Sequence, residues 1–527
     1  MSFHQLIQHT LDDTLGPSLS AFRPELAICG TIVALLLVRM LCPGWKRGAF
    51  YVALIGTGCS LWLAAPWHYL TTGVIAEPIP IFTGMLVFDT FAVYMRGLLL
   101  LFVLLFVVLT RISGPADRDS AAEFYVLILG ATLGMCLMVA ANHMMIVFLG
   151  IEMASVPSYV LAGMLKDQRP SSEAALKYAV YGAGTAGVML YGISLLVGAL
   201  GSAHLPTMAV QLGEMLQNPA YADRQLVLVL GGLMLAVGLA FKLAAVPFHF
   251  WAPDVFEGAS AEVAAFLSIA SKAAALALLV RLAIGFGSTP DPAAAAALEP
   301  VRQYVCGLAA LLAAVTCTFG NLAAYGQTNI KRLLAYSTIA HAGYMMMPVA
   351  AAVTLIGSDV AGTRSAIASM AFYVGVYLFM NLGAFAAVAF LRNVLGSETI
   401  ADYAGLIRRS PGLAVCFSLI LFSLVGLPPL AGFAAKFTIF AALFNARLLV
   451  LLAVGVVNTL LSLFYYLRVV RVMVLAAEPE HRPAPCIPMN SAAGSYCLIV
   501  TLPVVVWGIW WNGLFDWAAA ATSTLLF

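Results

Sequence analysis

The sequence has 527 residues, of which 62% are hydrophobic and only 9% are charged. Soluble globular proteins have roughly 45–50% apolar and about 25% charged residues, so this composition excludes an ordinary soluble fold and places most of the chain in lipid. The formal net charge of +2 gives no electrostatic reason to expect a nucleic-acid partner.

The nine cysteines are scattered singly, most of them in apolar runs, and none of them forms a C-x-x-C pair. A free cysteine in such a run behaves as a small buried hydrophobe. We therefore expect no iron–sulfur cluster and no zinc site in this chain. The N-terminal stretch MSFHQLIQHTLDDTLG lacks a basic region and a small-residue cleavage site, so no removable signal peptide is expected.

Fourteen hydrophobic spans follow in chain order, and a membrane-crossing helix needs about 20 apolar residues. The seventh and twelfth are too long for one straight crossing, and they contain Pro247 and the stretch Gly426-Leu427-Pro428-Pro429 respectively. A proline removes a backbone donor and clashes with the preceding turn, so both helices are predicted to be interrupted at mid-membrane. The predicted spans cover residues 24–42, 49–66, 85–109, 123–141, 143–163, 173–200, 225–257, 262–286, 301–325, 332–352, 365–392, 411–448, 449–473 and 494–513.

The two broken helices lie five spans apart. Because five is odd, equivalent helices in two five-helix units run in opposite directions. The sequence therefore predicts an all-α polytopic membrane protein with two inverted five-helix repeats, spans 4–8 and 9–13, and such paired broken helices indicate an ion or substrate path. The predicted domains are the N-terminal spans (1–120), the first repeat (121–290), the second repeat (291–475) and a C-terminal loop with span 14 (476–527).

The loop charges predict the orientation of the chain. Of the 26 Lys and Arg residues, fifteen lie on the side of the loops that follow odd-numbered spans, and five lie on the opposite side. Basic residues favour the cytoplasmic side, so both termini are predicted to face outward. The fifteen are Arg39, Lys46, Arg47, Arg111, Arg118, Lys166, Arg169, Lys331, Arg332, Arg392, Arg408, Arg409, Arg468, Arg471 and Arg482.

Several charged side chains fall inside the predicted spans. Lys242, Lys272 and Glu152 lie near the middle of their spans, and Lys436 lies just beyond the second break. A charge at the bilayer centre costs about 2.5–3.5 kcal/mol or more, so such residues are usually paired or line a water-filled path. The alternative for each is a structural salt bridge or a snorkelling side chain, and it is strongest for Lys177, which lies near the cytoplasmic start of span six.

Lysine suits proton transfer in a buried site, because removal from water favours its neutral form and a nearby carboxylate favours its charged form. Glu152 is the predicted partner of Lys242. Lys272, His341 and Lys436 would continue a hydrated line parallel to the membrane. His249, next to the first break, is either a further proton relay or a structural part of the break, and the sequence favours neither.

Four stretches together resemble the antiporter-like subunits of respiratory complex I. They are FKLAAVPFHFWAPDVFEGAS, SIASKAAALALLVRL, QTNIKRLLAYSTIAHAGYM and GLPPLAGFAAKF. PDVFEG and SSEAALKY make the chain most similar to the subunit N branch of the bacterial NADH–quinone oxidoreductase. The resemblance covers about residues 120–475.

The resemblance implies a fold of fourteen helices with two inverted repeats. It also implies that this chain is a proton-translocating subunit of a translocase in the bacterial inner membrane, with both termini periplasmic. The chain itself would bind no cofactor, because NADH, FMN, iron–sulfur clusters and quinone belong to other subunits. Its partners would be the antiporter-like subunit M, small subunits such as K and J, and the lipid bilayer. The proton-handling residues of the family fall on Glu152, Lys177, Lys242, Lys272 and Lys436.

Two positions depart from the family pattern. Glu262 stands where many relatives have a proline, and Arg96 lies inside span three, where it is expected to pair with a neighbouring subunit or a lipid headgroup. The main alternative is a subunit of a Mrp-type cation/proton antiporter, because those relatives share the FK…PFH…W…PD motif. A photosynthetic or ferredoxin-driven relative would have the same proton role with a different electron donor. A purely structural scaffold is disfavoured, since it has no need of costly lysines at mid-membrane.

Overall fold

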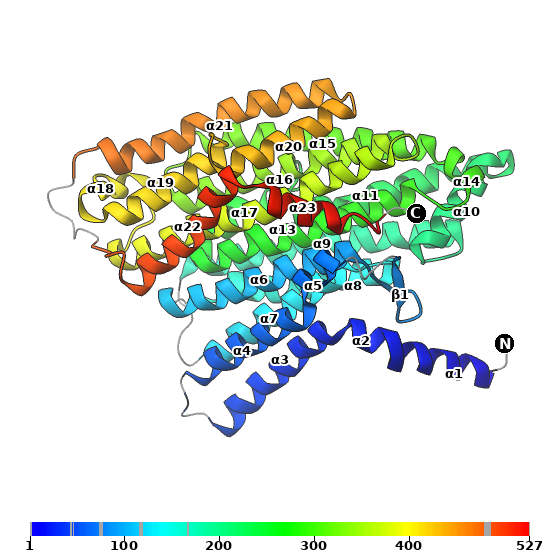
Figure 1. The fold of residues 1–527 in the computed structure, drawn as a ribbon, viewed down its shortest axis with the longest axis horizontal. Coiled ribbons are helices and arrows are strands. Elements are labelled where there is room, and N and C mark those ends of the chain that lie inside the picture. Colours follow the sequence, from blue (N-terminus) through cyan, green and yellow to red (C-terminus); the bar gives the residue numbers. More distant parts are fainter. Residues whose placement is uncertain are drawn as a thin grey trace.

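The computed structural model describes residues 3–42, 45, 47–72, 77–114, 120–165, 168–478 and 486–525. In these segments thirteen helices are long and apolar enough to cross a membrane, and they pack side by side in one bundle (Figure 1). They are α3 (Arg23–Leu41), α4 with α5 (Gly48–Ala64 and Pro66–Thr72), α6 (Thr90–Ser113), α7 (Ala121–Val139), α8 (Met144–Ala162), α9 (Arg169–Leu200), α11 (Gln225–Leu243), α13 (Ala261–Gly287), α15 (Glu299–Ala324), α16 (Ile330–Leu355), α17 (Val360–Leu395), α21 (Leu449–Leu475) and α22 (Ala492–Ile509).

Both predicted helix breaks are confirmed. Helix α11 ends at Leu243, and after residues 244–250 the chain forms the short helix α12 (Trp251–Gly258). The twelfth predicted span consists of two shorter helices, α19 (Pro411–Val425) and α20 (Ala431–Asn445). Together these two make one further crossing, so the described structure has the fourteen crossings that the sequence predicts. The inverted relation between spans 4–8 and 9–13 remains a prediction.

Shorter elements occupy the connections and the two ends of the described chain. Strand β2 lies inside the predicted third span, 85–109, so the prediction of a helix from residue 85 is wrong there, and α6 begins at Thr90. A small antiparallel hairpin pairs β1 with β2, with Ile79 opposite Phe88. The elements are α1 (Phe3–Asp13), η1 (Thr14–Ser18), α2 (Leu19–Ala21), β1 (Ile79–Ile81), β2 (Leu86–Phe88), α10 (Leu205–Gln217), η2 (Pro219–Arg224), α14 (Pro292–Ala297), η3 (Ile400–Tyr403), α18 (Leu406–Arg409) and α23 (Asn512–Ala521).

The core of the bundle is formed by α13, α16 and α17. All residues in the most apolar stretch of α17 are buried, as are nearly all of those in α13 and α16. Helices α3, α4, α9, α15 and α21 are equally apolar, but only 28–33% of the residues in equivalent stretches are buried. Exposed apolar helix faces of this kind are stable only in lipid or against other membrane subunits.

The two ends of the chain lie at the same end of the bundle, together with α10 and α14 (Figure 1). This agrees with the predicted even number of crossings. Which end faces the cytoplasm stays a prediction from the loop charges. Four of the basic residues that support it, Lys46, Arg118, Lys166 and Arg482, lie outside the described residues.

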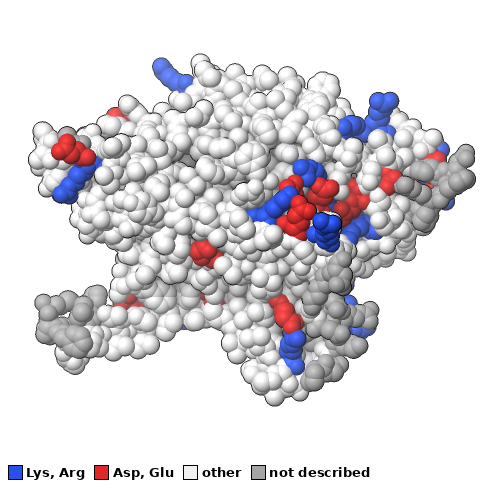
Figure 2. Space-filling model, turned by 180° about the vertical axis from the view of Figure 1, so that it is seen from behind, with Lys and Arg blue, Asp and Glu red and all other residues white. Residues whose placement is uncertain are grey.

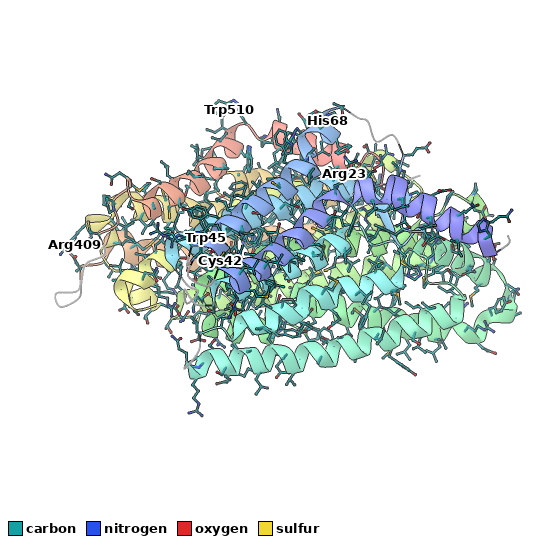
Figure 3. All side chains as sticks on the ribbon, turned by 90° about the horizontal axis from the view of Figure 1, so that it is seen from below. Arg23, Cys42, Trp45, His68, Arg409 and Trp510 are labelled. Carbon is teal, nitrogen blue, oxygen red and sulfur yellow. The ribbon has the colours of Figure 1, made fainter. Side chains whose placement is uncertain are left out.

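The N-terminal helices form a hairpin at one edge of the bundle. Cys42 and Trp45 lie at its connection, and Arg23 lies toward its opposite end (Figure 3). The expectation that Arg96 reaches a neighbouring subunit or a headgroup is wrong, because Arg96 Nη1 lies 3.2 Å from Glu25 Oε1 of α3 and both side chains are buried. A buried charge without a partner would be costly at this position. The ion pair between Glu25 of α3 and Arg96 of α6 avoids that cost.

The second break depends on one close backbone contact. A Cβ atom added to Gly432 would lie 1.8 Å from the carbonyl oxygen of Ser423, so α20 can approach the end of α19 only with glycine at this position. Gly432→Ala should therefore lower the free energy of unfolding by about 1–3 kcal/mol. The matched control is Gly307→Ala, since its Cβ would meet nothing within 4 Å. Melting temperature in detergent measures both, and equal values for the two variants would contradict the prediction.

Candidate functional site

Lys242 lies in the last turn of α11 and is only 1% exposed. Its Nζ donates a 2.9 Å hydrogen bond to Ser155 Oγ of α8. Glu152, its predicted partner, lies one helical turn before Ser155 and interacts with Lys242 electrostatically, although no ion pair within 4 Å joins the two described side chains. The structure thus places a hydroxyl in direct contact with the ammonium and the carboxylate further away.

Lys272 and Lys436 each bind the carbonyl end of a broken helix. Lys272 Nζ donates to the carbonyl oxygen of Leu243, the last residue of α11, at 3.0 Å. Lys436 Nζ donates to the carbonyl oxygens of Leu424 (3.2 Å) and Val425 (2.9 Å), at the end of α19. The last carbonyls of a helix lack intrahelical partners and carry partial negative charge, so they stabilise a nearby ammonium group. The breaks therefore create the binding positions for both lysines.

His341 lies between Lys272 and Lys436 in chain order and is 2% exposed on α16. Its Nδ1 is 2.7 Å from the Tyr373 hydroxyl of α17, and its Nε2 is 3.2 Å from the Tyr466 hydroxyl of α21. The imidazole is thus joined to hydroxyl groups on both sides, which is the arrangement that a proton relay needs. Sequence reasoning named His341 but did not find either tyrosine.

A second polar group connects this region to α13. Asn381 of α17 donates from Nδ2 to Ser268 Oγ (2.7 Å) and to the Tyr377 hydroxyl (2.8 Å). Ser268 lies one turn before Lys272 on α13, so these side chains extend the polar line from Lys272 toward α16. Within the described residues, Asn381 Oδ1 and Ser271 Oγ are buried without a partner. Buried polar atoms are rarely left unpaired, so this junction suits an ordered water.

The tyrosine hydroxyl beside His341 gives a sharp test of the polar line. Tyr373→Phe removes that hydroxyl and preserves the ring, and we expect roughly a fivefold loss of proton pumping, the equivalent of one net hydrogen bond. The matched control is Tyr403→Phe, because the Tyr403 hydroxyl is buried without a hydrogen-bond partner among the described residues. Proton uptake measured in vesicles should fall only in the first variant, and equal rates would remove Tyr373 from the line.

Lys177 has a different environment from the other predicted lysines. Its side chain is partly exposed, and its Nζ lies 2.7 Å from Asp254 Oδ2 and 2.8 Å from Glu173 Oε1. Lys177 differs from the buried lysines because it is partly exposed and pairs with carboxylates.

His249 lies in the segment between α11 and α12, where it is buried against the ring of Phe319. Its Nδ1 has no partner among the described residues. His249 is therefore held by aromatic contacts.

Charged side chains of both signs surround a polar cavity of about 600 Å³. It lies between the start of α9, α12, the start of α16 and the connection after α17. On a face with few other charges, Figure 2 shows one hollowed cluster of mixed sign. The charged residues that line the cavity are Glu173, Lys177, Asp254, Glu257, Lys331, Arg332, Arg392 and Glu398.

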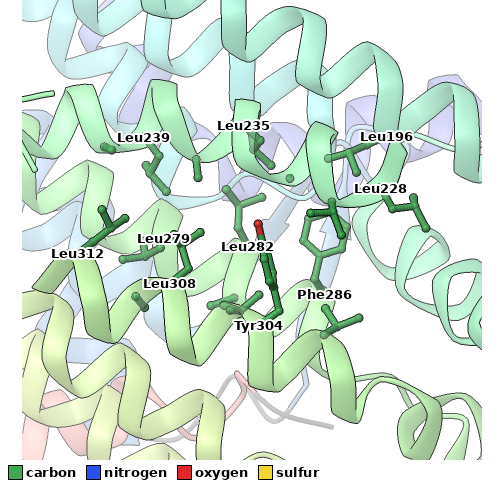
Figure 4. Close-up of a pocket in the computed structure, with 18 of the residues that line it drawn as sticks. Leu196, Leu228, Leu235, Leu239, Leu279, Leu282, Phe286, Tyr304, Leu308 and Leu312 are labelled. Atoms are coloured by element: carbon green, nitrogen blue, oxygen red, sulfur yellow. The ribbon is translucent and has the colours of Figure 1, made fainter. Parts of the chain in front are cut away.

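An apolar groove of about 340 Å³ lies between α11, α13 and α15 (Figure 4). Leucine side chains such as Leu239 and Leu282 line it, and the Tyr304 ring stands among them. The groove extends as far as Ala245, beside the first break. Its lining is almost entirely apolar, so the groove adds no polar group to the line of lysines. Such a surface is suited to contact with hydrocarbon rather than water.

No group of three or more His, Cys, Asp or Glu side chains in the described part of the chain could hold a metal ion. Two asparagines have structural roles among the described residues. Asn321 of α15 donates to Asn458 of α21, which joins two helices, and Asn329 caps the first turn of α16. These side chains hold helices together and lie outside the lysine line.

Comparisons with known proteins place the chain in a family. Residues 141–462 match the family described as "NADH:quinone oxidoreductase/Mrp antiporter, TM". The chain is 37% identical to NADH-quinone oxidoreductase subunit N of Anaeromyxobacter sp. (strain Fw109-5), with 99% of this chain and 98% of the relative covered. A chain of respiratory complex I from Thermus thermophilus has a TM-score of 0.73 and 30% identity, with 93% of this chain and 98% of that chain covered.

A chain of the Mrp complex from Dietzia sp. DQ12-45-1b has a TM-score of 0.77 at 19% identity, with 96% of this chain and 97% of that chain covered. This likeness shows a common fold alone. The broken helices and the buried lysines thus define an antiporter-like membrane subunit. Within that class, the chain belongs to the subunit N family of the NADH–quinone oxidoreductases. The resemblance read from the motifs is confirmed, and the Mrp antiporters are a related family.

Proposed function

We propose that this chain is a membrane-arm subunit of an NADH:quinone oxidoreductase and conducts protons across the membrane. Electron transfer from NADH to quinone, with FMN and iron–sulfur clusters, takes place in other subunits. One observation carries the proposal. Lys242, Lys272 and Lys436 are at most 3% exposed, and each is held by a neutral oxygen, with no carboxylate of the described residues at ion-pair distance. Three such groups are costly in a membrane, and a scaffold has no use for them.

The neutral contacts leave each lysine free to change its protonation state. Ser155 Oγ and the helix-end carbonyls accept hydrogen bonds from an ammonium group, and they hold it less strongly than a carboxylate does. Approach of Glu152 to Lys242 would favour the protonated lysine, and its withdrawal would favour release of the proton. Released protons would pass from Lys272 through the Asn381 junction and His341 to Lys436.

The remaining assignments follow from this function. Residues 121–290 and 291–475 are two half-channels, one around Lys242 with Lys272 and one around Lys436. Residues 1–120 and 476–527 add the flanking helices, which offer apolar faces to lipid or to neighbours. The neighbours are the antiporter-like subunit M and small subunits such as K and J. The chain acts as a non-redox part of a translocase in a bacterial inner membrane, with both termini periplasmic.

The first experiment is co-purification of the tagged chain in mild detergent. A large complex that oxidises NADH and shows flavin and iron–sulfur absorbance would support the proposal. An assembly of membrane subunits without these signals would overturn it. That second result would favour the cation/proton antiporter, for which the shared fold with the Dietzia Mrp chain is the specific observation. Sodium-dependent proton exchange in vesicles would then be the next measurement.

A further inference from the structure

The short helix α12 belongs to the first proposed half-channel and lies at its boundary with the second. It packs mainly against α9 of the first and α16 of the second. Its apolar side is fixed by Trp251, whose ring stacks on Tyr178 of α9 with 4.3 Å between the centroids and 8° between the planes. Its polar side carries Asp254 and Glu257, which line the polar cavity. The helix therefore has one anchored face and one charged face.

Asp254 contacts both half-channels with one carboxylate. Its Oδ2 accepts a 2.7 Å hydrogen bond from Lys177 Nζ of α9, and its Oδ1 accepts a 2.7 Å hydrogen bond from Arg332 Nη1 of α16. Among the described residues, Glu257 of the same helix pairs with Arg332 only, at 2.8 Å. Asp254 is thus the acidic residue of α12 that joins α9 to α16 in the described structure.

These ion pairs are of moderate strength. The side chains of Lys177, Asp254 and Arg332 are 38%, 29% and 31% exposed, and pairs at such positions are weakened by water and salt. Pairs of this kind cost little to break. They hold the charged side of α12, while the contacts of Trp251 hold its apolar side.

The position of α12 is linked directly to the buried lysines. The indole nitrogen of Trp251 donates a 3.0 Å hydrogen bond to the carbonyl oxygen of Phe241, which precedes Lys242. Two residues further on, the carbonyl oxygen of Leu243 accepts the hydrogen bond from Lys272. A shift of α12 would therefore move the end of α11, and with it the surroundings of both lysines.

We propose that Asp254 is a positioning residue that joins the two half-channels through α12 and keeps the Lys242 and Lys272 sites aligned for proton transfer. This rests on the proton-conducting function proposed above. When Asp254 loses either Lys177 or Arg332, its carboxylate no longer joins α9 to α16, and α12 can shift relative to one of these helices. The end of α11 then loses its fixed place relative to Lys272.

The test is Asp254→Asn in the assembled complex, with protons pumped per NADH oxidised as the readout. We expect normal assembly and melting temperature, and a fall in that ratio of roughly fivefold, as for the loss of a partly exposed ion pair. Asp254→Glu keeps both pairs and should restore the ratio. The matched control is Glu257→Gln. It removes a carboxylate of the same helix whose described partner is Arg332 of the second half-channel, and this variant should pump normally.

The outcomes separate this inference from the function on which it rests. Equal pumping ratios for Asp254→Asn and Glu257→Gln would overturn the positioning role and indicate a solvated ion cluster only. If Asp254→Asn fails to assemble, Arg332→Gln removes the guanidinium that pairs with Asp254 and Glu257 and should reproduce the lower ratio, since Glu257→Gln alone is expected to pump normally. A normal ratio in Arg332→Gln would overturn the role as well. If Lys242→Met pumps normally, the proposed function itself fails. Loss of pumping in Lys242→Met with normal pumping in Asp254→Asn removes this inference alone.

Discussion

Lys242→Met in the assembled complex should reduce proton pumping by roughly a hundredfold or more, the usual contribution of a group that transfers a proton. Methionine fills similar space and cannot carry a proton. Because a buried ammonium group is costly in a membrane, the substitution should leave assembly and melting temperature unchanged or improved. Proton uptake in vesicles, NADH oxidation and the size of the purified complex measure the three expectations.

The matched control for this prediction is Leu239→Met. Leu239 lies in the same helix, one turn before Lys242, so the variant introduces the same side chain without removing a charge. It should pump normally. Full pumping in Lys242→Met, or an equal loss in both variants, would contradict a proton-carrying role for Lys242. Loss of assembly in Lys242→Met alone would indicate a structural role.

The sequence predicted the crossings and both breaks because these depend on local chemistry. Apolar runs of sufficient length must cross lipid as helices, and Pro247 and the Gly426–Pro429 stretch interrupt two of them. At Gly426, where α19 ends, the backbone has a φ of 91°, a conformation that favours glycine, so the residue type itself indicates the end of the helix. No knowledge of neighbouring helices was needed for these conclusions.

The contacts of the candidate site could not be predicted, because they join helices far apart in the chain. The sequence paired Lys242 with Glu152, and the structure places Ser155 in direct contact instead. A serine in an apolar helix has too many ordinary uses to be singled out, since its hydroxyl can also bond within its own helix. For Lys177, only the partner Glu173, four residues earlier, could be read from the spacing, whereas Asp254 is 77 positions away.

The tyrosines around His341 were missed for a related reason. Tyr373 and Tyr377 lie one turn apart on α17, so they share a face, and this spacing was the available signal. Tyrosine in a membrane helix usually marks the lipid interface, and the sequence does not reveal that α17 is fully buried. The error for Arg96 has the same origin, because its partner Glu25 lies in another helix.

Arg281→Met should lower the free energy of unfolding by about 3–5 kcal/mol, the usual cost of leaving one member of a buried ion pair alone. Arg281 Nη1 and Nη2 bind the two carboxylate oxygens of Asp89 at 2.5 and 2.6 Å, and this pair joins α13 to the start of α6. Arg281 Nε also donates to the carbonyl oxygen of Val139 at 2.9 Å. Melting temperature in detergent and the yield of assembled complex measure the loss.

The double variant Asp89→Asn with Arg281→Met identifies the cause. Asp89 Oδ1 accepts a hydrogen bond from the backbone nitrogen of Ala92 at 2.7 Å, so Asp89 also caps α6, and asparagine can keep that contact without a charge. If the unpaired carboxylate causes the loss, the double variant should recover most of the stability. If the loss arises from the missing contacts of the arginine, the double variant should be at least as unstable as Arg281→Met. Recovery would show that α13, which carries Lys272, is fixed to the N-terminal helices by charge neutralisation rather than by packing alone.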